Sequence, residues 1–232
     1  MSWPLVKASD VIDVRDGTHD SPKYIESGIP LVTSKNLVDG GIDYDSCQFI
    51  SEEDHIAISK RSAVDNGDIL YAMIGTIGNP VIVEKRFDFS IKNVALFKFN
   101  NDSVFNRYVY HFLNSEGAIR QLLQQSRGGT QKFVSLGNLR DLRIPLPPLE
   151  EQKRIAAILD KADAIRRKRQ QAIKLADDFL RSVFLEMFGD LFCDAGYQTA
   201  LKKSIAELTN YIDYRGKTPE KSDFGIPLLI CV

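Results

Sequence analysis

Short apolar runs separated by turn residues fill the chain from Ile29 to Phe99. β-Branched and aromatic residues dominate the runs, and Gly, Asn, Asp or Pro occupy the turns at 39–41, 65–67 and 78–80. This pattern is typical of short strands. The predicted strands are Pro30–Thr33, Gln48–Ile50, Ile69–Ile74, Val81–Val83 and Val94–Phe99.

Two segments of the same region have helical patterns. Ser51 is a suitable N-cap residue for a short helix over Glu52–Ile58. Between 103 and 125, apolar residues recur at steps of three and four, which predicts one helix or a pair broken near Gly117. Together with the strands, these helices predict an α+β domain over residues 1–148.

A proline-rich segment, Pro145-Leu146-Pro147-Pro148, ends this domain, because proline interrupts strand pairing and helices alike. From Leu149 to about Phe188 the chain contains neither Pro nor Gly, which predicts one long helix. At about 1.5 Å per residue the helix would extend roughly 60 Å. Residues 189–232 are expected to be a linker and the incomplete start of a second domain.

An apolar seam with alternating steps of three and four follows this predicted helix and is typical of a coiled coil. Its positions are Ile155, Ile158, Ala162, Ile165, Arg169, Ala172, Ala176, Phe179 and Val183. Leu159, Ile173, Leu180 and Met187 widen the stripe, which favours more than one partner helix. Arg169 either sets the register, faces a phosphate or belongs to a solvated basic face. A long core helix of a single domain is the alternative interpretation.

The composition of the 232 residues, 44% hydrophobic and 26% charged, is that of a globular protein. No apolar run approaches the roughly 18 residues of a membrane span, and the N-terminus lacks a signal-peptide pattern. We therefore expect a cytoplasmic protein without membrane association. The three cysteines are far apart, which excludes a disulfide framework and a CxxC metal site.

The charges are unevenly distributed, although the formal net charge is only -1. Residues 1–60 contain 11 acidic and 5 basic residues, whereas residues 85–143 contain 10 basic and 4 acidic residues. A polyanion would contact the second stretch more readily. Ordinary scatter of surface charge is the alternative.

Catalytic motifs are missing from the sequence. There is no GxGxxG turn and no Asp/Asn-Pro-Pro-aromatic motif, and the single Glu-x-Lys, at Glu151, opens the long helix, where it cannot hold magnesium beside a strand. The three histidines have no metal-ligand spacing, and His19 is of interest because it lies in a repeated turn. We therefore expect a binding module with no catalytic residues, no metal and no cofactor.

A glycine-rich basic loop, Ser126–Lys132, is the strongest candidate for DNA contact. Its backbone N–H groups suit phosphates, Arg127 suits guanine and Gln131 suits adenine. A flexible linker is the alternative interpretation.

The chain also repeats itself. Val11–Thr18 and Gly28–Leu31 recur as Tyr211–Thr218 and Gly225–Leu228. The residues after Tyr197 are too few for a second core like the first. We expect a truncated gene product or a fragment of a longer two-unit protein.

The segments Gly128–Phe133 and Leu142–Ala156, with Gly67–Leu70 and Gly75–Gly78 upstream, resemble the specificity (S) subunit of type I restriction-modification systems. That family is built as a target recognition domain, a conserved helix, a second recognition domain and a second helix. The resemblance implies that residues 1–148 read one half of a split double-stranded DNA target in the major groove. The helix at 149–188 would dock methyltransferase (M) subunits, with the restriction (R) subunit as a further candidate partner, and the partner chains would carry out methylation and cleavage.

On this basis we expect several side chains to contact DNA, with Lys92 and Arg107 on phosphates. The candidates are Arg127, Thr130, Gln131, Lys132, Lys35, Asn36, Thr18, His19, Lys92 and Arg107. The seam predicts self-association, in which two identical recognition domains would read an interrupted palindrome. The alternative is a degenerate fragment that binds M subunits or another S subunit without reading DNA.

Overall fold

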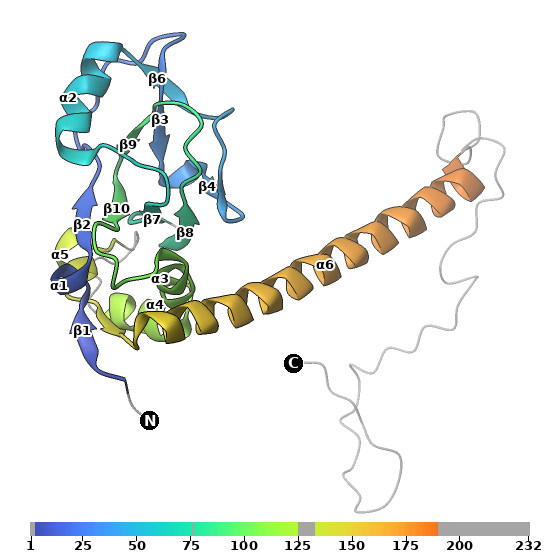
Figure 1. The fold of residues 1–232 in the computed structure, drawn as a ribbon. Coiled ribbons are helices and arrows are strands. Elements are labelled where there is room, and N and C mark those ends of the chain that lie inside the picture. The colour runs from blue at the N-terminus through green and yellow to red at the C-terminus, as the bar shows by residue number, and fades with distance from the viewer. Residues whose placement is uncertain (1–2, 76, 125–132, 190–232) are drawn as a thin grey trace, which may run out of the picture. The chain divides into compact units, whose positions relative to one another are not determined.

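The computed structural model of the chain describes residues 3–75, 77–124 and 133–189 (Figure 1). The glycine-rich loop at 126–132 and the second copy of the repeat lie outside these residues. By its internal contacts the chain divides into two units, residues 1–168 and 169–232. The first unit therefore includes the start of the long helix as well as the predicted domain.

The described elements confirm the α+β prediction. The strands are β1 (Leu5–Lys7), β2 (Asp13–Asp16), β3 (Ile29–Thr33), β4 (Leu37–Val38), β5 (Gly41–Ile42), β6 (Gln48–Ile50), β7 (Ile69–Ala72), β8 (Gly78–Ile82), β9 (Ser90–Lys92), β10 (Val94–Lys98) and β11 (Arg143–Pro145). The helices are α1 (Ala8–Val11), the 3-10 helix η1 (Ser34–Asn36), α2 (Glu52–Ser62), α3 (Asn106–Leu113), α4 (Glu116–Gln124), α5 (Leu136–Arg140) and α6 (Leu149–Phe188).

Local capping explains where the predicted helices begin. The Ser51 hydroxyl accepts a hydrogen bond from the Asp54 N–H at 3.1 Å, as its N-cap role requires, and α2 runs on to Ser62. The segment 103–125 forms two helices, as one of the two alternatives predicted. The break lies before Gly117, because the Ser115 hydroxyl accepts from the Ala118 N–H and so starts α4.

A four-stranded antiparallel sheet, in the order β2-β10-β7-β8, is buried on both faces. Tyr71 and Phe97 belong to a core shared with α3, α4 and α5. Leu70 and Leu96 point the other way, into a second core shared with β3 and β9. In Figure 1 the helices α1, α3, α4 and α5 accordingly lie at the lower end of the domain, and β3, β6 and β9 at the upper end.

A second sheet, β6-β3-β9, contains the one parallel strand pair among the described strands. Val32 lies opposite Ile91 and Thr33 opposite Lys92, so β3 and β9 end side by side. The chain at Gly17 and Thr18 runs along the same edge, where the Thr18 N–H donates to the Ile91 carbonyl at 3.0 Å. A Cβ on Gly17 would lie 2.3 Å from the Ile91 oxygen, which explains the glycine.

The first copy of the sequence repeat uses its recurring residues for structure. Ile12 is buried, and the Arg15 guanidinium donates to the Asp13 carboxylate through Nε at 2.9 Å and Nη2 at 2.6 Å. A Cβ on Gly28 would lie 2.4 Å from the Ile50 oxygen. The repeated positions thus fix the fold around β2 and β3.

The long helix α6 has the bounds that the sequence predicts, Leu149–Phe188, and spans 40 residues. Its described side chains are buried only at Gln152 and Ala156. The Gln152 amide donates to the carbonyls of Ser103 and Pro147, each at 2.9 Å, and accepts from the Phe105 N–H at 2.9 Å. This one side chain therefore fastens the start of α6 to the segment that precedes α3.

Replacing Gln152 by Ala should lower the free energy of unfolding by about 2 kcal/mol, because the Phe105 N–H and the carbonyls of Ser103 and Pro147 lose a hydrogen-bond partner that is fully buried. Urea denaturation measures the change. Gln170→Ala, at an exposed position of the same helix, is the control and should stay within about 0.5 kcal/mol of the wild type. Equal stability of the two variants would contradict the role of Gln152.

Candidate nucleic-acid interface

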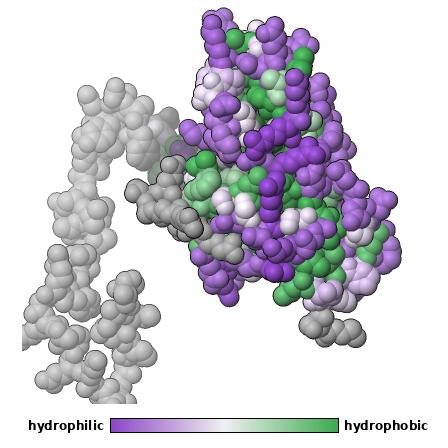
Figure 2. Space-filling view, turned by 90° about the vertical axis from the view of Figure 1, so that its left-hand side faces the viewer, coloured by the Kyte–Doolittle hydropathy of each residue, from purple (hydrophilic) through white to green (hydrophobic). Residues whose placement is uncertain are grey.

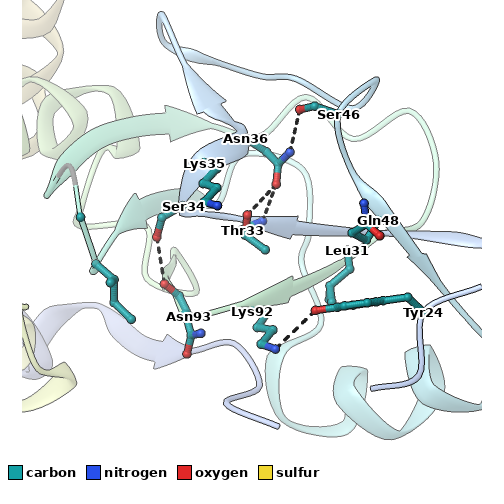
Figure 3. A pocket seen from close by; sticks show the side chains of 12 residues that line it. Tyr24, Leu31, Thr33, Ser34, Lys35, Asn36, Ser46, Gln48, Lys92 and Asn93 are labelled. Carbon is teal, nitrogen blue, oxygen red and sulfur yellow. Dashed lines mark hydrogen bonds between the residues drawn. The ribbon is translucent and has the colours of Figure 1, made fainter. Parts of the chain in front are cut away.

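An open hollow of about 740 Å³ lies where β3 and β9 end (Figure 3). We call it the β3–β9 hollow. Its lining consists of Tyr24, Leu31, Thr33, Ser34, Lys35, Asn36, Ser46, Gln48, Ile74, Gly75, Lys92 and Asn93.

Asn36 forms the floor of the hollow and is only 4% exposed. Its Oδ1 accepts hydrogen bonds from the Thr33 N–H and the Thr33 hydroxyl, each at 2.8 Å. Its Nδ2 donates to the Ser46 hydroxyl at 3.0 Å and to the Asp43 carbonyl at 3.3 Å. An amide side chain offers four hydrogen-bonding positions, so Asn36 is saturated within the fold.

The turn after β9 is held from two sides. The Ser34 hydroxyl donates to the Asn93 carbonyl at 3.1 Å (Figure 3), and His19 Nδ1 lies 2.8 Å from the Asn93 Oδ1. Asn93 has a φ of 54°, a left-handed conformation that asparagine tolerates better than most residues. These contacts fix the backbone at the rim of the hollow and so the direction in which Lys92 projects.

His19 is placed to carry a positive charge. Its Nε2 lies 2.8 Å from Asp16 Oδ2, so both ring nitrogens face oxygen atoms. The hydrogen bond to Asn93 and then the one to Asp16 raise the pKa of His19. The Asp16 side chain is 5% exposed and also pairs with the Arg61 guanidinium, so this carboxylate joins the 17–28 segment to α2.

Lys92 holds the 17–28 segment against β9. Its ammonium donates to the Ser21 hydroxyl at 2.6 Å and approaches the Tyr24 hydroxyl at 3.5 Å. The same ammonium lies 6.0 Å from the centroid of the Tyr24 ring. Thr18 is bridged to Lys92 through the backbone.

Two polar side chains of the hollow form no hydrogen bonds that stabilise the described fold. Lys35 and Gln48 are both exposed, and neither side chain hydrogen-bonds to a described residue. No carboxylate belongs to the described lining, although acidic residues outnumber basic ones two to one in residues 1–60. The hollow is therefore a positively charged and hydrogen-bonding surface in an acidic part of the chain.

The structure brings together five of the ten predicted DNA-contact residues. Lys35, Asn36 and Lys92 line the hollow, and Thr18 and His19 contact its rim. The predicted contacts Arg127, Thr130, Gln131 and Lys132 lie outside the described residues.

Arg107 is placed elsewhere, on α3. Its Nε donates to Asp160 Oδ1 of α6 at 2.7 Å, and its guanidinium lies 5.1 Å from the Tyr110 ring. His111 Nε2 lies 2.7 Å from the same carboxylate oxygen. The pKa of Asp160 is lowered: desolvation opposes the shift, but the hydrogen bonds from His111 and Arg107 outweigh it. Arg107 is thus engaged in fastening α6 to α3.

Gln48 and Tyr24 line the hollow but are not among the contacts predicted from the sequence. Gln48 was predicted only as the first residue of a strand, and its place follows from its pairing opposite Leu31 in β3. A polar residue at the start of an apolar strand is a weak signal, because exposed strand ends are commonly polar. Tyr24 lies in a segment without a periodic pattern.

A second surface runs along α6. Most of the predicted seam is exposed in the described chain, including Ile158 at 54%, Ile165 at 56% and Phe179 at 67%. Ile155, near the start of the helix, is half-buried against the first core. Contiguous exposed apolar side chains of this kind mark an interaction surface. Figure 2 shows the α2 side of the domain, where hydrophilic residues surround apolar patches.

Other kinds of site are not found in the described residues. They contain no cluster of three His, Cys, Asp or Glu side chains that could hold a metal ion. None of their helices is both long and apolar enough to cross a membrane.

Residues 2–175 match the family described as the type I restriction modification DNA specificity domain. The chain belongs to this family. In type I systems the specificity subunit is non-catalytic, and the activities lie in the methyltransferase and restriction subunits. The family therefore confirms the prediction that the chain is not an enzyme.

Relatives within the specificity family include two curated proteins. The chain is 25% identical over 200 residues to the type I restriction enzyme MjaVIII specificity subunit of Methanocaldococcus jannaschii, which covers 79% of this chain and 45% of that protein. It is 27% identical over 169 residues to the EcoBI specificity subunit of Escherichia coli, covering 71% and 35%. The chain thus spans less than half the length of these relatives.

A solved structure from a study of complex assembly and conformational transition in a type I restriction-modification system has the same fold. The TM-score is 0.63 at 20% identity, over 82% of this chain and 46% of that chain. The fold expected of a specificity subunit, a recognition-type domain followed by a long helix, is therefore confirmed.

Removing His19 should destabilise the specificity domain in a pH-dependent way. Because the folded-state pKa is raised, the contribution of His19 is fully present below its ordinary value of about 6.5 and is lost as the pH rises through the folded value. The free energy of unfolding of His19→Ala, compared with the wild type, should differ by at most about 1 kcal/mol near pH 5.5, since the pair is partly exposed. The difference should shrink toward pH 8.5. A difference that is constant over this range would contradict the charged pair.

Proposed function

We propose that the chain is the DNA-recognition subunit of a type I restriction-modification complex, in which it reads one half of a bipartite target and positions M subunits. The observation that carries this proposal is the β3–β9 hollow, which presents Lys35 and Lys92 without a carboxylate in its described lining. Lysines beside hydrogen-bonding side chains suit a polyanion whose base edges carry donors and acceptors. We also propose a cytoplasmic location, because the double-stranded DNA that this subunit would bind lies there.

The candidate residues receive different roles in this proposal. Lys92, with Thr18 beside it, contacts phosphate, and His19 holds the turn that presents Lys92. The saturated amide of Asn36 supports the floor of the hollow. Arg107 belongs to the attachment of α6 through Asp160. Arg127, Thr130, Gln131 and Lys132 remain predicted DNA contacts.

We assign the docking of partners to α6. Its exposed apolar side chains need a protein partner, and the Arg107 ion pair and the His111 hydrogen bond at Asp160 fix the first turns of the helix against the recognition domain. M subunits that bind this helix would then be held at a set distance from the bound half-target. The R subunit would join through the M subunits.

Self-association through α6 is a second part of the proposal. The seam has a regular a/d register, and its side chains from Ile158 to Phe179 are exposed. Two copies joined by an antiparallel helix pair would carry two identical recognition domains, so that the target would be an interrupted palindrome.

Expression with the cognate M subunit in a methylation-free host tests the function. We expect methylated adenines to map to a split motif across the host genome, because the recognition domain selects the site. A palindromic split motif would support the symmetric pair, and an asymmetric motif would mean that a different second half joins the complex. A stable complex that methylates no defined motif would contradict DNA reading and favour the degenerate interaction protein.

Substitution of Phe179 by Glu should convert a dimer into a monomer, since a charge in the seam cannot be buried against a second helix. Sedimentation at micromolar concentration gives the oligomeric state. Lys174→Glu, outside the seam on the same helix, is the matched control and should leave the dimer intact. A wild-type chain that is strictly monomeric, both alone and with the M subunit, would rule out the symmetric pair.

A further inference from the structure

We propose that Gln48 and Lys35 determine the sequence specificity of the recognition domain, with Gln48 reading an adenine and Lys35 reading a guanine from the β3–β9 hollow. This inference rests on the proposed function and names the side chains that select the target.

The polar side chains within the hollow divide into two groups. Thr33, Ser34 and Asn36 use their side chains in bonds that shape the hollow, as the dashed lines in Figure 3 show. Lys35 and Gln48 hydrogen-bond to no described residue. A side chain that reads a base must be free to form new hydrogen bonds when DNA binds. Of the five side chains named here, only those of Lys35 and Gln48 are free in this sense.

The backbone that carries Gln48 and Lys35 is rigid. Gln48 starts β6 and is paired with Leu31 of β3. Lys35 lies in η1, between Thr33 and Asn36, whose side chains bond to each other and so close the turn around it. Both side chains therefore project from backbone that is fixed before DNA binds, which lowers the entropy cost of recognition. The apolar surface of Ile74 in the same hollow suits the methyl group of a thymine.

Both side chains match the hydrogen-bonding edges of particular bases. The amide of glutamine matches the N6 and N7 atoms of adenine with two hydrogen bonds, and lysine donates to O6 and N7 of guanine. Lys92 does not compete for this role, because its ammonium already bonds Ser21 and stays at the rim. A good contact of this type discriminates against the wrong base by roughly tenfold to a hundredfold.

The test starts from the motif that the wild-type complex methylates. Duplexes with every single-base change in that motif are then compared for binding to the wild-type complex, Gln48→Ala and Lys35→Ala. We expect each variant to lose roughly tenfold or more of its discrimination at one position only, an adenine for Gln48 and a guanine for Lys35. Gln48→Glu should also shift the preferred base from adenine to cytosine, because a carboxylate accepts from cytosine N4.

Matched controls are Gln124→Glu on α4 and Lys60→Ala on α2, which are exposed and lie outside the hollow. Both should keep the wild-type motif. Unchanged discrimination at every position in the Gln48 and Lys35 variants would overturn the inference while the function stands. A uniform loss of affinity at all positions would also overturn it, because it would assign these side chains to the DNA backbone. A wild-type complex without any motif would instead refute the proposed function, and this inference with it.

Discussion

The parallel pairing of β3 with β9 is the constraint on which the candidate site depends. It joins Val32 to Ile91 and Thr33 to Lys92, so two strands about sixty residues apart in the chain end at the same edge. An antiparallel pair would have placed the segment after β3 and the segment after β9 at opposite ends of the sheet. Because the pair is parallel, Lys35 and Lys92 follow neighbouring strand ends and line one hollow.

The sequence predicted those features that depend on local signals. Proline before Leu149 and the absence of Pro and Gly up to Phe188 were enough to give the bounds of α6, and Ser51 gave the start of α2. The hollow could not be predicted in the same way, because strand partners far apart in the chain leave no periodic signal. Asn36 shows the consequence: its residue type suits adenine, and only the structure shows that Thr33 and Ser46 already use its amide.

The attachment of α6 explains the sequence motif at the start of the helix in physical terms. The buried amide of Gln152 hydrogen-bonds to three backbone groups of the recognition domain and its proline-rich end, and Asp160, two turns further on, contacts Arg107 and His111. Both residues face the recognition domain, whereas the seam from Ile158 to Phe179 is exposed. One helix can therefore hold the domain firmly on one face and still offer an apolar face to partner chains.

Within the hollow, the residues that support the fold differ from those proposed to read bases, and this difference affects how specificity can change. A substitution at the buried Asn36 removes the hydrogen bonds to Thr33, Asp43 and Ser46, so its effect on the fold would mask any effect on DNA. Lys35 and Gln48 are exposed, and substitutions at such positions cost the fold little. If these two residues read bases, a new target sequence requires substitutions only at positions where the side chain contributes little to the stability of the fold. The saturated floor would then keep its geometry while the target changes, and α6 would dock the same partners throughout.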